Sequence, residues 1–165
     1  MKLFSFEDWE LTQDTLRDVL YYNPKTGEFH WLVKPASRVH IGNRAGSRET
    51  ERGYWVIGIA GKLYKAHRLA WLYVYGVFPK HLDHINRNPT DNRIKNLREA
   101  TKLQNSGNSK TRRAGLKGAY WHKPDRKWTS AVAGKWLGNF NTEQEAHAAY
   151  CKAAKKVYGE FFNPG

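Results

Sequence analysis

A polar, glycine-rich and basic stretch interrupts the second half of the chain. Residues 105–118 read NSGNSKTRRAGLKG, which is the composition of a linker. At 165 residues, the chain is long enough for one ordinary domain or for two small ones with modest cores. Because the sequence patterns before and after this stretch differ, we expect two modules.

Short helices and strands are predicted before the linker, from apolar spacing and from turn residues such as those of NPKTGE. Gly76 follows a run of apolar and aromatic residues, as the C-terminal cap of a buried helix would. The expected order is a helix at 12–22, a turn at 23–28, a strand at 29–34, a loop at 36–53, two strands within 54–65 and a helix at 66–76.

After the linker, the pattern predicts a small antiparallel sheet and one helix. Residues 119–140 alternate, with turns at 123–127 and 133–135. Thr142 and Glu145 have the spacing of a capping box, alanines and other apolar residues recur behind them, and Gly159 ends the helix. The chain is therefore expected to have an α+β fold.

The charge of the chain indicates a polyanionic partner. The net charge is +13, from 28 basic and 15 acidic residues. Residues 1–50 carry no net charge, residues 51–113 carry +9 and residues 114–165 carry +4. A lipid surface fits less well than nucleic acid, because there is no long basic amphipathic helix.

Composition also excludes several classes of protein. Hydrophobic residues make up 40% of the chain and aromatic residues 14%, which is typical of a folded protein. The single cysteine, Cys151, excludes an internal disulfide and a zinc site with two or more thiolates. No apolar run approaches the roughly 18 residues of a membrane helix, and the N-terminus lacks the apolar core of a signal peptide. We expect a cytoplasmic protein.

The stretch HLDHINRNPTDNRIKNLREATKLQN, residues 81–105, holds two His, two Asp and five Asn. Phosphodiester hydrolysis needs a base to activate water and a cation to stabilise the developing charge. Asp83 and an Asn carbonyl are oxygen donors of the kind Mg²⁺ prefers, and His84 has a near-neutral pKa suited to a general base. This inventory fits a nuclease that uses one metal ion.

The spacing of Asp83-His84, of Asn96 and of Asn105 closely resembles the HNH endonucleases. The flanking segments resemble the phage-type homing branch of that family, and the resemblance spans roughly residues 11–110. It implies a ββα-metal nuclease module with an N-terminal helix and strand extension, at residues 1–110. The flanks that carry it are HRLAW at 67–71, LDHINRN at 82–88, DNRIKNLREAT at 91–101 and QNSGN at 104–108.

This resemblance also implies roles for particular residues. His84 would be the catalytic base, and Asn96 would orient it through its backbone carbonyl. Asp83 and Asn105 would bind one divalent metal ion, most simply Mg²⁺ with Mn²⁺ as a substitute, and no structural zinc is expected. The third letter of the motif is often His in this family, whereas this chain has Asn105.

Two further asparagines are possible accessory residues. Asn92 lies between His84 and Asn96 and could act at the site or simply cap a turn, a common role of Asn in loops. Asn108, one helical turn beyond Asn105, could assist with metal or phosphate. Asn96 has the same structural alternative as Asn92.

Residues 118–165 resemble the apetala-type DNA-binding domain of plant ethylene-response factors, after a linker at 111–117. The resemblance implies a three-stranded sheet that enters the major groove and packs on one helix. Tyr120 and His122 stand where the plant proteins have base-reading arginines, so the plant base code should not transfer. The matching pieces are GAYW at 118–121, KWTSAV at 127–132, WLGNFNTEQEA at 136–146, AYCKAA at 149–154 and YGEFFN at 158–163.

Basic and aromatic residues in both modules are the predicted contacts to DNA. The basic side chains would bind phosphates, and alternate side chains on the sheet would meet base edges. The predicted set is Arg87, Arg93, Arg98, Arg112, Arg113, Tyr120, His122, Lys123, Arg126, Lys127, Lys135 and Trp136.

The sequence therefore predicts a metal-dependent DNA endonuclease of the homing or mobile-element type, encoded by a phage and acting in the host cytoplasm. With one site per chain, a monomer would nick double-stranded DNA. No membrane contact is expected. Two alternatives stay open: a non-catalytic, sequence-specific DNA-binding regulator built from the same modules, and an RNA-binding protein, since positive charge does not distinguish the polymers.

Overall fold

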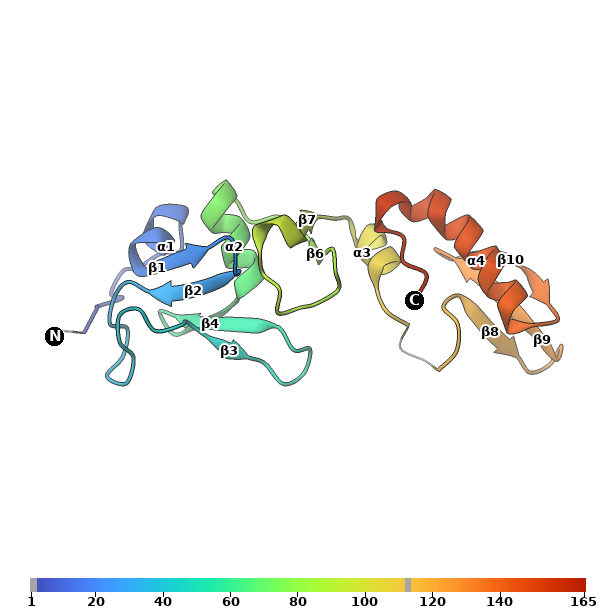
Figure 1. Ribbon diagram of the computed structural model, residues 1–165, viewed down its shortest axis with the longest axis horizontal. Coiled ribbons are helices and arrows are strands. Elements are labelled where there is room, and N and C mark those ends of the chain that lie inside the picture. The colour runs from blue at the N-terminus through green and yellow to red at the C-terminus, as the bar shows by residue number, and fades with distance from the viewer. Residues whose placement is uncertain (1–2, 112–113) are drawn as a thin grey trace. The chain divides into compact units, whose positions relative to one another are not determined.

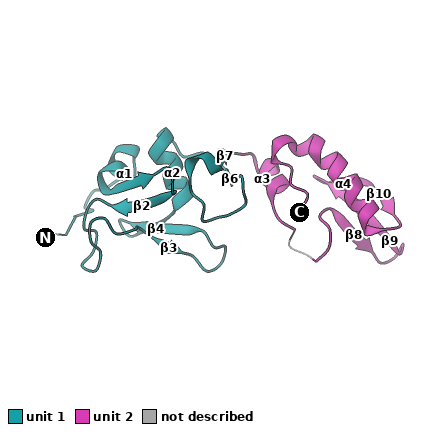
Figure 2. Cartoon of the chain, in the orientation of Figure 1, with its two compact units in different colours: residues 1–99 teal, residues 100–165 magenta. Residues whose placement is uncertain are grey.

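A computed structural model describes residues 3–111 and 114–165 (Figure 1). The chain divides into two compact units, residues 1–99 and residues 100–165 (Figure 2). All sheets among the described residues are antiparallel, and with the helices they confirm the expected α+β class. No helix in the described ranges combines the length and apolar character that a membrane crossing requires. Arg112 and Arg113, two of the predicted DNA contacts, lie outside the described residues.

The first unit contains three small sheets and two helices around one apolar core. The sheets pair β1 with β2, order β3-β4-β5, and pair β6 with β7. Leu16, Leu20, Phe29, Ile57 and Leu69 are among its completely or almost completely buried side chains. Its elements are α1 (Gln13–Val19), β1 (Leu20–Asn23), β2 (Glu28–Trp31), β3 (Ser47–Arg48), β4 (Trp55–Ile59), β5 (Lys62–Lys65), α2 (Ala66–Tyr75), β6 (Leu82–His84) and β7 (Leu97–Glu99).

The helix expected at 12–22 is shorter in the structure. Thr12 caps it, as expected, but the helix ends at Val19 and the chain continues as strand β1. This strand pairs with β2, with Tyr22 opposite Phe29, and Gly27 adopts the left-handed conformation (φ 77°) in the turn between them. Tertiary pairing of aromatic residues therefore overrides helical spacing here.

The other predicted elements of the first unit fit the structure with smaller differences. Helix α2 ends at Gly76 in the left-handed conformation, and β4 and β5 flank the expected turn at Ala60 and Gly61. The strand expected at 29–34 is β2 and ends at Trp31, whereas the loop expected at 36–53 contains the short strand β3, which pairs with β4.

The second unit consists of a three-stranded sheet, a long helix and a short helix. Helix α4 packs on the sheet, which has the strand order β10-β9-β8, and Thr142 and Glu145 form the predicted capping box. Val132 and Tyr150 are buried between sheet and helix. The elements are α3 (Lys102–Asn108), β8 (Ala119–His122), β9 (Lys127–Val132), β10 (Lys135–Phe140) and α4 (Glu143–Tyr158).

Helix α3 is packed within the second unit, so the segment that reads as a linker from residue 105 begins with ordered, buried backbone. Gly107 lies against Tyr158, and a Cβ at Gly107 would come within 2.5 Å of the Tyr158 ring. The Lys117 ammonium donates to the carbonyls of Gly107, Ser109 and Asn163 at 2.6–2.9 Å. The functional boundaries at 1–110, 111–117 and 118–165 stay a prediction.

This packing predicts that Gly107→Ala destabilises the protein by about 1–3 kcal/mol, because the added methyl group overpacks the contact with Tyr158. In a solvent-exposed helix, the same change would stabilise by about 0.5–1 kcal/mol. Urea denaturation measures the sign. The exposed neighbour Ser106, changed to Ala, is the control and should be close to neutral; a stabilised Gly107→Ala variant would contradict the packing of α3 on α4.

Candidate functional site

The hairpin of β6 and β7 carries the predicted Asp-His pair. In its antiparallel register, Asp83 lies opposite Arg98 and His84 lies opposite Leu97. Successive side chains of a strand point to opposite faces, so Asp83 and His84 contact different groups. The strand β6 ends at His84.

His84 is buried, with 7% of its surface exposed. Its Nε2 lies 3.2 Å from Oδ1 of Asn92, and its ring lies 4.9 Å from the His67 ring and 6.1 Å from the Tyr54 ring, between centroids. Burial lowers the pKa of His84, and this outweighs the opposing effects of Asn92 and the nearby carboxylates. The imidazole is therefore neutral near pH 7, the form that can accept a proton.

Asp83 is held by an arginine of the paired strand. The Nε and Nη2 atoms of Arg98 each lie 3.0 Å from Oδ2 of Asp83, and both side chains are largely buried. Arg98 was predicted to contact DNA, and the structure shows that its guanidinium is engaged with Asp83. The hydrogen bond and the ion pair both reach the same oxygen, so Arg98 restrains the Asp83 side chain through Oδ2.

Asn96 closes the loop between the two strands of the hairpin. Its Oδ1 accepts a hydrogen bond from the Asn86 amide at 3.0 Å, and its Nδ2 donates to Oδ1 of Asn86 and to the carbonyl of Asp91. Its carbonyl accepts from the amide of Ile85, the residue after His84. The orienting role of its carbonyl toward His84 stays a prediction.

Asn92, predicted either to act at the site or to cap a turn, is buried beside His84. Asn92 is 2% exposed, and its side chain bonds to the His84 ring. Its carbonyl accepts a hydrogen bond from the Tyr22 hydroxyl at 2.7 Å. Sequence reasoning missed Tyr22 and Tyr54. Aromatic residues far from the motif give no sequence signal of such contacts.

Two other predicted DNA contacts lie on the loop of the hairpin. Arg93 donates from Nε and Nη2 to the two carboxylate oxygens of Asp91, and this hydrogen bonding lowers the pKa of the Asp91 carboxyl. Arg87 adopts a positive φ of 61° at the turn that follows His84. Neither observation tests DNA contact, which stays a prediction for both.

The two predicted metal ligands lie on different elements. Asp83 is on β6, and Asn105 is on α3, where Asn108 is buried. No group of three or more His, Cys, Asp and Glu that could hold an ion occurs within residues 3–111 and 114–165. Carboxylate and amide oxygens are donors of the kind that Mg²⁺ prefers. The binding of one ion by Asp83 and Asn105 stays a prediction.

The sheet of the second unit presents one face to α4 and another to solvent. Ser130 and Val132 of β9 are buried. On the opposite face, Trp136 is 65% exposed and its indole donates to Oγ1 of Thr129, which pairs with the exposed Tyr120. The open face therefore combines aromatic surface with hydrogen-bonding groups.

The remaining predicted contacts of this unit are exposed. His122 lies 3.1 Å from the carboxylate of Asp125, and the Lys127 ammonium donates to the side chain of Asn141. Lys123, Arg126 and Lys135 lie at or beside the strand ends.

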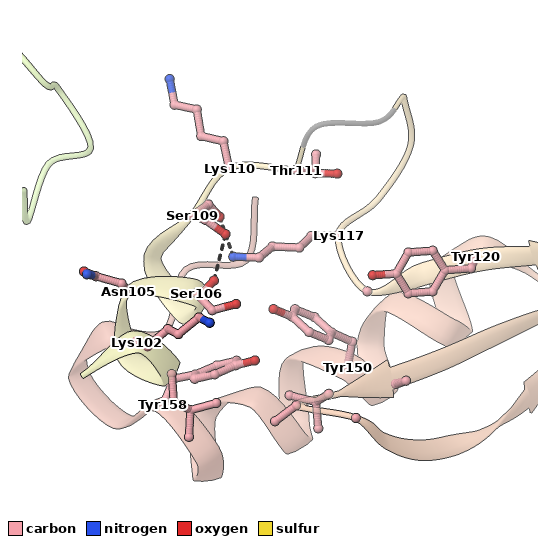
Figure 3. Close-up of a pocket in the computed structure, with 16 residues that line it drawn as sticks. Lys102, Asn105, Ser106, Ser109, Lys110, Thr111, Lys117, Tyr120, Tyr150 and Tyr158 are labelled. Carbon is pink, nitrogen blue, oxygen red and sulfur yellow. Dashed lines mark hydrogen bonds between the residues drawn. The ribbon is translucent and has the colours of Figure 1, made fainter. Parts of the chain in front are cut away.

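A cavity of about 850 Å³ lies within the second unit, between α3 and the sheet with α4 (Figure 3). Lys102, Lys110 and Lys117 line it together with the tyrosines at 120, 150 and 158. The ammonium of Lys117 is bound to backbone carbonyls, and burial raises the pKa of Tyr150. Asn105 also lines this cavity.

Comparisons with known proteins agree with the motif. A family model of HNH endonucleases matches residues 64–106, from β5 to α3, which includes Asp83, His84, Asn96 and Asn105. The chain is also similar to Protein 3.8 of Escherichia phage T7, with 32% identity over 111 residues, or 61% of this chain and 92% of that protein. No solved structure matches.

On these matches, the chain belongs to the same family as Protein 3.8 of phage T7 and carries an HNH endonuclease domain within residues 64–106. The predicted resemblance to HNH endonucleases is thus confirmed for the central segment. The matches give no support to the apetala-type resemblance of residues 118–165, which stays a prediction.

The burial of His67 predicts acid destabilisation of the first unit. Burial lowers its pKa to about 3, and its Nδ1 has no hydrogen-bond partner among the residues that the structure describes. The unfolded chain therefore binds a proton near pH 6.5 that the folded chain does not, so stability is lost as the pH falls from about 6.5 toward 3. Between pH 7 and 4.5 the loss should be on the order of 2 kcal/mol.

Denaturation followed by tryptophan fluorescence at both pH values measures this loss, with His67→Phe as the comparison. The variant keeps a ring but cannot take up a proton, so its stability should depend less on pH. Equal pH dependence of the two proteins would contradict a neutral, buried His67.

Proposed function

We propose that the protein is a metal-dependent DNA endonuclease that hydrolyses phosphodiester bonds with His84 as general base. The observation that supports this best is a buried His84 with a lowered pKa next to an oriented Asp83, inside the segment matched by the HNH endonuclease model. Such an imidazole can take a proton from water near pH 7.

Asp83 and Asn105 would hold the metal ion, for which Mg²⁺ fits the oxygen donors and Mn²⁺ would substitute. The ion would supply charge stabilisation to the phosphate and to the leaving oxygen. Arg98 keeps the Asp83 carboxylate in a fixed orientation. Asn96 holds the loop that follows His84, and its carbonyl would orient the base. Asn105 is assigned from its position in the motif.

Double-stranded DNA is the proposed substrate, because the charge excess surrounds the site and the family is one of endonucleases. Residues 118–165 would form an apetala-type module whose open sheet face, with Tyr120 and Trp136, enters the major groove. The proposed contacts are Arg87, Arg93, Arg98, Arg112, Arg113, Tyr120, His122, Lys123, Arg126, Lys127, Lys135 and Trp136.

A monomer with one such site would nick one strand. The similarity to a phage protein favours a phage-encoded enzyme of the homing or mobile-element type, working in the host cytoplasm. The alternative is a DNA-binding regulator without catalysis, built from the same units.

His84→Ala should lower the rate of plasmid nicking by about 10²–10⁴-fold, because the general base is removed. Its affinity for DNA should stay within a few-fold, since a neutral imidazole contributes little to phosphate binding. Relaxation of supercoiled plasmid with Mg²⁺ measures the rate, and fluorescence anisotropy of a labelled duplex measures affinity.

His81→Ala is the matched control, three residues earlier, and should cut at the parent rate. A chelator should stop the parent enzyme. If the parent protein binds DNA but leaves plasmid intact at every Mg²⁺ and Mn²⁺ concentration, the regulator is the correct function. Parent-level cutting by His84→Ala would remove His84 from the role of base.

If basic residues of the second unit's sheet bind phosphate, their removal should weaken the salt dependence of DNA affinity. Each lost phosphate contact lowers the slope of log affinity against log salt by about 0.9. The combined change of Lys123, Arg126 and Lys127 to Ala should therefore lower that slope by about 3.

The control removes the same charge from α4, at Lys152, Lys155 and Lys156, all exposed. Titrations of a duplex over a salt series compare the two triple variants. Equal slopes would mean that the effect is one of net charge and that the sheet edge does not contact phosphate.

A further inference from the structure

The imidazole of His84 makes a hydrogen bond whose chemistry fixes the position of a proton. A side-chain carbonyl oxygen only accepts, so the 3.2 Å contact between Oδ1 of Asn92 and Nε2 of His84 requires the proton on Nε2. In the neutral ring, the lone pair then lies on Nδ1. Both side chains are buried, so water competes little for this bond.

Asn92 is in turn held from the N-terminal hairpin of β1 and β2. The Tyr22 hydroxyl donates to the Asn92 carbonyl at 2.7 Å, and Tyr22 is 2% exposed, with its ring packed on Phe29 and Tyr73. Burial raises the pKa of Tyr22, so the hydroxyl stays protonated and remains a donor.

Gly27, in the turn of the same hairpin, lies close to the peptide bond between Asn92 and Arg93. A Cβ at this position would lie 2.5 Å from the Arg93 nitrogen and 2.6 Å from the Asn92 carbonyl carbon. A residue with a side chain would push the Asn92–Arg93 backbone away. The hydrogen bond from Tyr22 therefore fixes the Asn92 carbonyl relative to the hairpin, and Gly27 leaves room for the Asn92–Arg93 backbone.

We propose that Asn92 is a positioning residue that holds the His84 ring with its proton on Nε2, and that Tyr22 and Gly27 hold Asn92. The hairpin at residues 20–31 thereby becomes part of the machinery around the base. The catalytic consequence rests on the function proposed above, in which His84 is the base whose ring must be held in one orientation.

The first test is spectroscopic and needs neither metal nor DNA. Long-range ¹H–¹⁵N spectra of the ¹⁵N-labelled full-length protein at pH 7.5 report which ring nitrogen carries the proton, and His84→Gln assigns the signals. The parent should show protonated Nε2. Asn92→Ala should shift His84 to a mixture of tautomers, and Asn92→Asp, which keeps an acceptor oxygen, should restore the parent form.

The hairpin is tested separately by a matched pair of variants. Tyr22→Phe removes only the hydroxyl that bonds to Asn92, whereas Tyr21→Phe removes an exposed hydroxyl from the neighbouring residue, which is 48% exposed. Tyr22→Phe should alter the His84 signals and Tyr21→Phe should not. Because Tyr22→Phe keeps the packed ring, it tests the proposal even if Asn92→Ala does not fold.

The rate of DNA cleavage provides the second test of the positioning role. Asn92→Ala should lower the single-turnover rate by about 10–100-fold, as loss of a residue that orients an active-site ligand does. Tyr22→Phe should lower the rate a few-fold. Affinity for DNA should be unchanged in both, which separates positioning from a loss of binding.

The outcomes distinguish the two proposals. A parent ring protonated on Nδ1, or an unchanged tautomer in both Asn92→Ala and Tyr22→Phe, overturns the positioning role whatever the activity. A shifted tautomer in a protein that never cuts DNA supports the positioning role and removes the nuclease function.

Discussion

The geometry of the candidate site depends on the hydrogen bond between His84 and Asn92. A buried imidazole without a partner costs free energy, so a partner inside the protein stabilises it. The partner, Asn92, lies on the loop of the hairpin, which folds back onto its own strand. The bonds of Asn96 to Asn86 and Asp91 hold the loop in that shape. The buried ring and the Asn96 hydrogen bonds therefore hold the same loop.

Adjacent residues at the site have opposite electrostatic surroundings. Asp83 forms an ion pair with Arg98, whereas burial among aromatic rings lowers the pKa of His84 and keeps it neutral. Strand alternation produces this separation without any special backbone geometry. An ion-paired carboxylate and a neutral imidazole can therefore be neighbours in the chain.

The sequence identifies the candidate catalytic residues of this site better than the residues that hold them in position. Asp83 and His84 stand out because a carboxylate beside an imidazole suits metal binding and base catalysis, and Asn96 is identified through the resemblance to HNH endonucleases. By contrast, Asn92 reads equally well as a turn cap, because its partner is eight residues away and local rules cannot indicate it. The helix expected at 12–22 fails for a similar reason. Its last residues pair with β2, and pairing across a turn is decided by tertiary contacts.

Two glycines have tertiary roles that their neighbours in the sequence do not indicate. Gly107 reads as part of a linker, yet it is buried. Tyr158, at the end of α4, takes the space that a side chain at Gly107 would fill. Gly27 reads as an ordinary turn glycine, yet it also makes room for the Asn92–Arg93 backbone.

Tyr22 and Gly27 both lie outside the segment that the HNH endonuclease model matches, residues 64–106. A family motif records the groups that perform the chemistry, whereas rigidity comes from whatever packs against them. In this chain the packing partner is the N-terminal hairpin, which carries almost no excess charge and so is a poor candidate for binding DNA itself. Its contribution is better understood as holding one asparagine, and through it one imidazole, in place.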